Sequence, residues 1–376
     1  MLKKIQPRVN TFGAFAFAAV LLITMTATSQ ENLSGRTLAA PAANSDGKIK
    51  ILVYHDMEGL AGQADWHTFS FRHLEHYKKG QEMLIADVNA VIDGLFSGGA
   101  EVVHVVDAHG SGNPDPDILL DRLDQRAQMV TRDKPFRQYV DIVEAGTYDA
   151  VACVGMHAKT GSAGFASHTF TLGMDIIMND MSITETELIG YSWGRAEVPV
   201  IFTSGDDKLA QDLKTMPWLE YVAVKKASSG STADLRPVDE VHREMREAAK
   251  RAVKNLAKAK VMKLTTPIRA ALRVAPPASL EILKSVPGID YKDNRASFVA
   301  ADFQAAYDGV IALIGVATTA YSALMFEMLR QQPNGENFIL QYRDLLTTRW
   351  LDVESGRWHA DPPPEPPAGR KYYGAR

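Results

Sequence analysis

Two acidic residues stand two positions apart, directly after an apolar run of the chain. The run 49–53 predicts a buried strand, Asp56 and Glu58 follow it, and Gly59 marks the turn that ends the segment. Because side chains alternate along an extended backbone, the two carboxylates point the same way. Carboxylates held side by side repel each other unless a cation lies between them or one is protonated. The pair therefore indicates a cation site or a site that handles protons.

Imidazole groups follow further apolar runs of the same kind. His109 comes shortly after the predicted strand 101–106, His157 comes shortly after 150–154, and His168 lies eleven residues beyond His157. Carboxylates and imidazoles together suit a divalent transition metal, and zinc is the expected one. Taken singly, an Asp or His after a strand is more often a cap or turn residue. The metal interpretation depends on their joint placement.

The elements that would position these groups alternate between strands and helices. Strands are predicted at 49–53, 101–106, 150–154 and 198–203, and helices at 78–96, 136–145 and 185–195. Such alternation predicts an α/β fold, with a mostly parallel sheet flanked by helices. Ligands of such sheets collect at the carboxyl ends of the strands. We therefore expect the acids and histidines to converge there.

The rest of the chain predicts a smaller C-terminal α+β lobe. After a basic amphipathic helix at 238–260, the pattern gives a strand at 269–274, a short helix at 278–284, a strand at 295–299 and a helix at 303–328. The expected organisation is a signal peptide 1–29, a linker 30–47, a metal-binding α/β domain 48–265, the lobe 266–350 and a Pro-rich tail 351–376.

The N-terminus has the order of a secretory signal. Lys3, Lys4 and Arg8 precede an apolar stretch at 12–25, and small residues follow it. The stretch is short for a membrane span, and no second stretch is expected to be long enough for one. An uncleaved anchor is the alternative. We expect an exported protein, periplasmic or extracellular, without stable membrane insertion after cleavage.

The composition and the absence of certain motifs argue against several classes of function. The 376 residues carry a net charge of −4, which argues against a generic nucleic-acid binder. Cys153 is the single cysteine, so an intrachain disulfide and a cysteine-based zinc site are both excluded, and it is expected to be a buried hydrophobe. The chain has no phosphate-binding glycine motif and no Gly-x-Ser-x-Gly elbow, which disfavours nucleotide binding and serine hydrolase chemistry.

These motifs, taken together, resemble the zinc-dependent D-aminopeptidase family of the dipeptide-transport-operon type. The resemblance runs from Asp-Met-Glu-Gly through Asp-x-His, Gly-x-His with a second His eleven residues on, Asn-Asp followed by Glu, and Val-Pro-Val to Gly-Asp-Asp. It covers about 49–207 and continues more weakly to about 328. The family pattern has Ser where this chain has Tyr54, and the dipeptide-cleaving members lack a signal peptide. Both departures bear on the substrate and shift it toward cell-wall or environmental peptides.

The resemblance implies a role for each matching position. Asp56 would bridge two zinc ions in each subunit. Glu58 and His109 would complete one zinc site, and His157 and Glu185 would complete the other, with Glu187 the choice if the alignment slips. His168 matches the catalytic group. The family also implies a decamer of stacked pentameric rings.

The expected function is that of a metallopeptidase, a di-zinc aminopeptidase that removes N-terminal residues, D-amino acids first among them, from short peptides. Asp107, Asp206 and Asp207 are candidates either to hold the free α-amino group or to support the metal ligands. Three different functions stay open at this point. They are a metallo-amidase or L-aminopeptidase acting on cell-wall peptides, a non-enzymatic periplasmic peptide-binding protein, and a structural protein.

Overall fold

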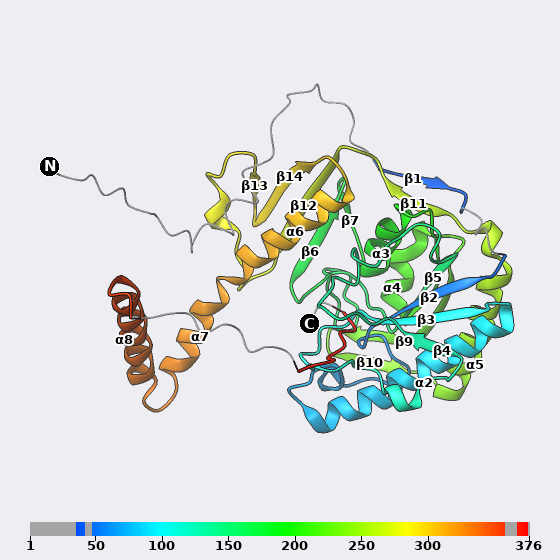
Figure 1. Cartoon of the computed structure of the whole chain (residues 1–376), viewed down its shortest axis with the longest axis horizontal. Helices are drawn as coiled ribbons and strands as arrows, with labels where there is room; N and C mark the ends of the chain where they lie inside the picture. The colour runs from blue at the N-terminus through cyan, green and yellow to red at the C-terminus, as the bar shows by residue number, and fades with distance from the viewer. Residues whose placement is uncertain (1–34, 42–46, 358–366, 375–376) are drawn as a thin grey trace.

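The computed structural model describes residues 35–41, 47–357 and 367–374 (Figure 1). The predicted signal peptide 1–29 and part of the predicted linker lie outside these residues. The described part of the linker contains a strand, β1 (Arg36–Ala39), which pairs antiparallel with β11 (Val261–Leu264). This segment is therefore fixed to the body of the protein rather than being a free connection.

A seven-stranded sheet forms the centre, in the order β10-β9-β8-β5-β2-β3-β4. Its strands are β2 (Lys50–His55), β3 (Val102–Asp107), β4 (Ala127–Met129), β5 (Ala150–Val154), β8 (Val200–Asp206), β9 (Glu220–Ser229) and β10 (Thr232–Leu235). All neighbours are parallel except the edge pair β9–β10. The chain builds outward from β2 through β3 to β4, then returns to the other side of β2 with β5. The order reverses between β2 and β5, where doubly wound folds bind their ligands.

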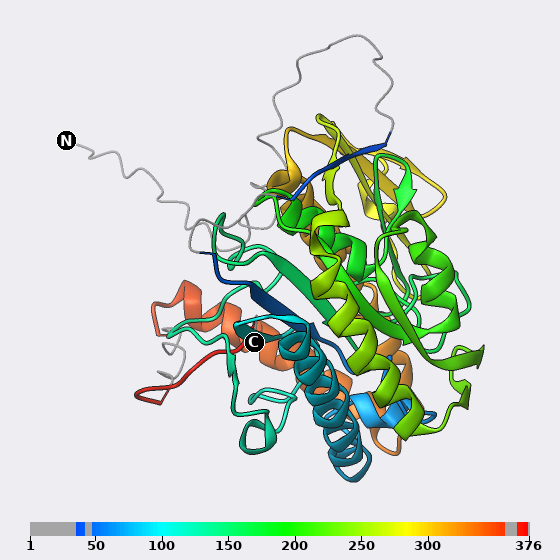
Figure 2. The same ribbon diagram turned by 90° about the vertical axis from the view of Figure 1, so that its right-hand side faces the viewer.

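Helices cover both faces of this sheet (Figures 1 and 2). Ile51 and Val53 of β2 face the core formed with α2 (Leu74–Gly98) and α5 (Val238–Lys254). The alternate residues of β2 face the other core, which holds α3 (Glu185–Gly194) and α4 (Asp207–Asp212). A strand with apolar side chains on both faces needs a cover on both, which explains the uninterrupted apolar run in the sequence.

A second, antiparallel sheet has the order β13-β14-β12-β6-β7. Its strands are β6 (Met174–Met178), β7 (Met181–Ser182), β12 (Ile268–Val274), β13 (Asp290–Lys292) and β14 (Arg295–Ala300), and α6 (Phe303–Thr318) packs on it. Strands β6 and β7 come from within the segment assigned to the α/β domain. The predicted lobe therefore completes a sheet begun earlier in the chain, and its core is continuous with one face of the central sheet.

Two predicted helices are wrong. Residues 136–145 form turns, because the carbonyls of this segment accept hydrogen bonds from side chains: Tyr54 Oη donates to Gln138 O at 2.7 Å, and Ser192 Oγ donates to Tyr139 O. These bonds orient the carbonyls toward side chains of other elements instead of along a helix axis, which favours turns. The short helix expected at 278–284 is reduced to a single 3-10 turn, Glu281–Leu283.

The predicted helix at 303–328 is two helices, α6 and α7 (Tyr321–Arg330), followed by α8 (Gly335–Glu354). The 28-residue stretch Phe303–Arg330 is long and apolar enough to cross a membrane by length and composition, so the expectation of no such second stretch is wrong. Its α6 half buries Tyr307, Val310 and Leu313 against the second sheet, as a core helix does.

The loops that follow β2 and β5 approach each other closely, and this approach depends on glycine. Gly155 has φ +75°, and a Cβ there would lie 2.3 Å from Asp56 O. Gly59 faces the same junction, where its N–H donates to Gly155 O at 2.7 Å. Glycine accepts positive φ and gives the two loops their close approach.

We predict that Gly155→Ala destabilises the protein by about 3 kcal/mol, the sum of a left-handed backbone and an overpacked contact. Gly99→Ala is the matched control, because Gly99 has φ +113° but open space around its Cβ position. It is expected to cost only ~1 kcal/mol. Equal losses for the two variants in urea unfolding would show that the contact with Asp56 O is unimportant.

Candidate metal centre

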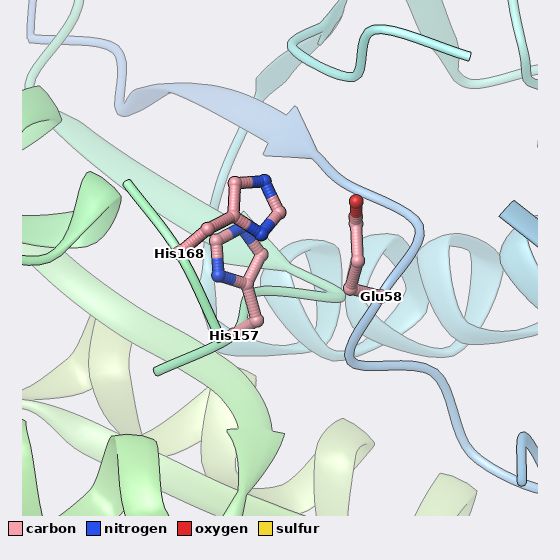
Figure 3. A group of neighbouring side chains, drawn as sticks. All are labelled: Glu58, His157 and His168. Atoms are coloured by element: carbon pink, nitrogen blue, oxygen red, sulfur yellow. The ribbon is translucent and has the colours of Figure 1, made fainter. Parts of the chain in front are cut away.

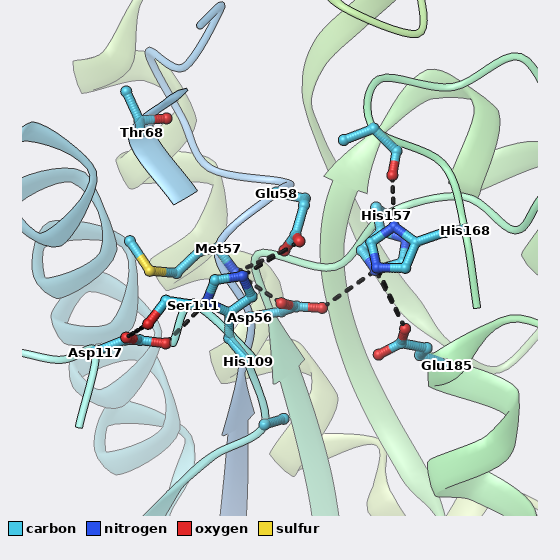
Figure 4. Close-up of polar contacts among 12 residues, drawn as sticks. Asp56, Met57, Glu58, Thr68, His109, Ser111, Asp117, His157, His168 and Glu185 are labelled. Carbon is cyan, nitrogen blue, oxygen red and sulfur yellow. Dashed lines mark hydrogen bonds and ion pairs between the residues drawn. The ribbon is translucent and has the colours of Figure 1, made fainter. Parts of the chain in front are cut away.

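The six residues singled out in the sequence lie together at the carboxyl ends of β2, β3 and β5 (Figure 4). Asp56 and Glu58 follow β2, His109 follows β3, and His157 follows β5. The other two come from the His168 loop and from the first residue of α3, Glu185. All six side chains are buried, with exposed fractions from 2% to 9%.

The ligand atoms fall into two overlapping groups that share one carboxylate. Asp56, Glu58 and His109 form one group, and Asp56, His157 and Glu185 form the other, with the ligand atoms of each within 4.8 Å of one another. A third combination places His168 with Glu58 and His157. Asp56 is thus positioned between two sets of acid and imidazole ligands, as a bridging carboxylate would be.

Distances between the ligand atoms fit an ion better than hydrogen bonds. His109 Nε2 lies 3.3 Å from Glu58 Oε1, and His157 Nε2 lies 3.4 Å from both Asp56 Oδ2 and Glu185 Oε1. Ligands of tetrahedral zinc, each about 2.0–2.1 Å from the metal, lie about 3.3–3.4 Å apart. Direct charge-assisted hydrogen bonds are shorter, about 2.7–2.9 Å. The spacing is therefore that of ligands around a cation.

Each histidine turns its Nε2 atom inward because its Nδ1 atom is occupied. His109 Nδ1 bonds Asp117 Oδ2 at 2.8 Å, His157 Nδ1 bonds Ala158 O at 3.0 Å, and His168 Nδ1 bonds Ala166 O at 2.7 Å. These partners only accept, so Nδ1 carries a proton, and with a cation in place Nε2 would present its lone pair to it. His157 Nε2 is buried and makes no hydrogen bond in the structure. A buried ring nitrogen that faces two carboxylates without a hydrogen bond fits a metal ligand.

Glu185 is held in place by its own partners. Tyr139 Oη donates to Glu185 Oε2 at 2.9 Å, and the Phe170 N–H donates to Glu185 Oε1 at 2.6 Å. Phe170 has φ +74°, a strained value for this residue, and the bond to the carboxylate offsets that strain. Glu187 accepts instead from Thr184 N in the capping box of α3, so it turns away from the centre.

The acids and imidazoles of the centre strongly shift one another's pKa. Burial and the nearby charge of Glu58 raise the pKa of Asp56. Burial also opposes the charge on Glu185, but His157 outweighs it and lowers the pKa of Glu185 to about 2. For His157 itself, burial is outweighed by Glu185 and Asp56, which raise its pKa. Three buried carboxylates therefore require compensating positive charge, which a divalent metal supplies.

His168 differs from the two other histidines of the centre. Burial, helped by the charge of His157, lowers the pKa of His168, so its imidazole is neutral near pH 7. Its ring stacks on that of His157 with centroids 3.9 Å apart (Figure 3). His168 Nε2 lies 3.9 Å from Glu185 Oε1 and faces the cavity. A neutral imidazole at this place is suited to accept a proton.

Sequence reasoning missed two buried groups that support the ligands. Asp117 accepts from His109 and also from Ser111 Oγ and Tyr77 Oη. Lys225 Nζ donates to Glu58 O at 2.7 Å and lies over the Phe165 ring, and burial lowers the pKa of Lys225 to about 7. Neither stands next to a ligand in the sequence, so no local pattern marks them.

The three aspartates considered as amine-binding groups accept bonds from the backbone. Asp107 accepts from the N–H groups of His109 and Asp117, and Asp206 caps α4 and accepts from Phe165 N. Asp207 accepts from Ala227 N at 2.7 Å. These contacts favour support of the loops over direct contact with a substrate. Asp107 is the one of the three that lines the cavity.

A second His and Asp group lies at the surface. Asp65 contacts His67 Nδ1 at 2.6 Å and His76 Nδ1 at 2.5 Å. These are hydrogen-bond distances, shorter than the spacing between two ligands of one zinc ion. We interpret this group as a hydrogen-bond network at the start of α2.

A cavity of about 350 Å³ opens onto the ligands. Its lining includes Asp56, Glu58, His109, His168 and Glu185 together with Tyr139 and Phe170. The volume is at the small end of the range for ligand pockets, about 300–1,000 Å³. Buried acids and imidazoles beside such a cavity are the arrangement of a metal-dependent enzyme.

Comparison with known proteins gives the particular family. The model of the peptidase M55 family, described as D-aminopeptidase, matches residues 49–311, and the chain belongs to this family. The D-aminopeptidase of Bacillus subtilis (strain 168) is 28% identical over 276 residues, which are 72% of this chain and 98% of that protein. The solved structure of the zinc-dependent D-aminopeptidase DppA from Bacillus subtilis, a self-compartmentalizing protease, superimposes with a TM-score of 0.64 at 24% identity, over 72% of this chain and 98% of that one.

These findings confirm the family resemblance, the prediction of a metallopeptidase, and the mostly parallel sheet flanked by helices. They do not favour a metallo-amidase, an L-aminopeptidase or a non-enzymatic peptide-binding protein.

We predict that Asp117→Asn weakens zinc binding about 10–100-fold, because the amide cannot replace the carboxylate that orients His109. Asp121→Asn is the control, since Asp121 is exposed on the neighbouring 3-10 turn. Competition with a zinc chelator measures the affinity. Unchanged affinity in Asp117→Asn would contradict the orienting role.

Proposed function

We propose that this protein is a zinc-dependent aminopeptidase that releases N-terminal D-amino acids from short peptides and holds two zinc ions in each subunit. The observation that carries the proposal is Asp56, shared between two buried groups of acid and imidazole ligands beside one cavity. The names of the relatives support the D-aminopeptidase activity and zinc.

Five residues would hold the metal: Asp56 between the two ions, Glu58 and His109 at one, and His157 and Glu185 at the other. When bound, zinc activates water and polarises the carbonyl of the scissile bond. The protein's own groups set the conditions for this chemistry. Asp117 and the Ala158 carbonyl fix the tautomers of His109 and His157, and burial keeps the centre out of bulk water.

His168 is the proposed catalytic group. Its Nδ1–H is tied to Ala166 O, so its Nε2 is free to take a proton from the attacking water. The same atom then delivers that proton to the amine that leaves when the peptide bond breaks. Stacking on His157 keeps the ring beside the ligands throughout.

We also propose that the chain forms a homo-oligomer, with the decamer as the expected state. The relative described as self-compartmentalizing supports assembly. Helices α7 and α8 extend from the body as an arm (Figure 1). The arm has exposed apolar side chains, among them Met328, Phe338, Leu345 and Trp350. Exposed apolar surface of this kind marks interaction sites. Light scattering of the full chain tests the assembly, and a monomer would contradict it.

Export is proposed from the sequence. The basic residues and apolar stretch of residues 3–25 support a secretory signal, which would place the mature protein in the periplasm or outside the cell. The N-terminal sequence of protein recovered from the periplasm tests this. An intact Met1 in cytoplasmic protein would contradict it.

Paired D-alanine and L-alanine peptides test the activity. We predict zinc-dependent release of alanine from the D-peptides, lost on chelation and restored by zinc, measured as free amino acid. Cleavage of L-peptides alone would keep the centre but overturn the stereochemistry. Stoichiometric metal without hydrolysis of either peptide would overturn the aminopeptidase proposal.

We predict that His168→Ala keeps its zinc but loses about 10²–10⁴-fold in kcat, because it lacks the neutral imidazole that lines the cavity beside the ligands. His104→Gln is the control, since His104 bonds Tyr148 Oη away from the cavity. Loss of zinc from His168→Ala would instead make His168 a metal ligand.

A further inference from the structure

The C-terminal segment 367–374 returns to the metal centre from outside the family region. The family match ends at residue 311, whereas Tyr372, Tyr373 and Gly374 line the same cavity as Asp56 and His168. The segment therefore adds to the cavity a wall that the matched region does not contain.

Backbone pairing and ion pairs hold this segment in place. The Tyr372 N–H donates to Arg132 O at 2.9 Å, and the Arg132 N–H donates to Tyr372 O at 3.0 Å. Lys371 Nζ lies 2.5 Å from Asp133 Oδ1, and Arg370 donates to Pro114 O at 3.2 Å. These contacts reach two separate loops beside the centre, so the segment spans the edge of the cavity as a strap.

The fit of the strap is close at its inner end. Gly374 is buried, and a Cβ there would lie 2.9 Å from Asp107 O. Tyr372 is partly buried and packs against the core cluster that contains Phe136 and Tyr139. By contrast, the ion pair of Lys371 is exposed on both sides, and such pairs contribute little. The inner end of the strap thus packs closely against the cavity, whereas the exposed ion pair of Lys371 holds its outer part only weakly.

We propose that residues 367–374 form a substrate-limiting strap, in which Tyr372 and Tyr373 close the cavity to longer peptides. This inference rests on the proposed aminopeptidase function. The cavity has room for a short peptide, and Tyr372 and Tyr373 line it, where they would obstruct a longer one. Opening the strap should therefore favour longer peptides and also expose the metal ligands to solvent.

Two variants test the strap: a chain shortened to end at Pro366, and a full-length chain with Tyr373→Ala and Lys371→Ala. The first readout is kcat/KM for a D-alanine dipeptide and pentapeptide. We expect the ratio of kcat/KM for the pentapeptide to that for the dipeptide to rise about tenfold, through a lower KM of the pentapeptide. Tyr373→Phe should keep the native ratio. Lys284→Ala, which removes an exposed ion pair with Glu281 elsewhere, is the control.

The second readout does not depend on hydrolysis. Zinc loss to excess chelator should be faster in the shortened chain than in the full chain or in Lys284→Ala. If no peptide is cleaved by any variant but zinc loss is faster, the aminopeptidase proposal fails and the strap stands as a cover of the centre. If both the length ratio and the zinc loss rate stay unchanged, the strap inference is wrong.

Discussion

Repulsion among three buried carboxylates is the constraint on which the site depends. Asp56, Glu58 and Glu185 lie within one buried cluster, and each is nearly inaccessible to water. A proton on Asp56 relieves part of the repulsion, since burial and the charge of Glu58 raise the pKa of Asp56. Divalent cations relieve it more fully, and the ligand separations of 3.3–3.4 Å match that solution.

The fold brings these charges together through the reversal of strand order between β2 and β5. Loops after the two strands meet there, and Gly59 and Gly155 permit a contact that any side chain would prevent. A doubly wound sheet often uses this point for a dinucleotide, held by a glycine-rich turn. Here Asp56, Glu58 and His157 occupy it instead. The point where the strand order reverses therefore holds candidate metal ligands in this protein.

The ligands at the strand ends can be predicted from the sequence because each one lies close in sequence to the strand that positions it. An apolar run fixes each strand, and Asp56, Glu58, His109 and His157 follow within a few residues. Glu185 opens a helix, and only the family resemblance indicates it. Long-range contacts lie beyond such reasoning: Asp117 reaches His109 through a turn, and Lys225 reaches Glu58 from β9. The wrong helix prediction at 136–145 has the same cause, since side chains from distant elements donate hydrogen bonds to carbonyls of this segment.

The central claim is that Asp56 binds two ions. Elemental mass spectrometry of purified protein tests it by measuring the number of zinc ions per subunit. The account predicts two zinc ions per subunit in the native chain, one in Glu185→Gln, and fewer than one in Asp56→Ala. The two variants differ because Glu185 belongs to a single ligand group whereas Asp56 belongs to both. A single zinc ion per native subunit, or one ion retained by Asp56→Ala, would contradict the bridging role.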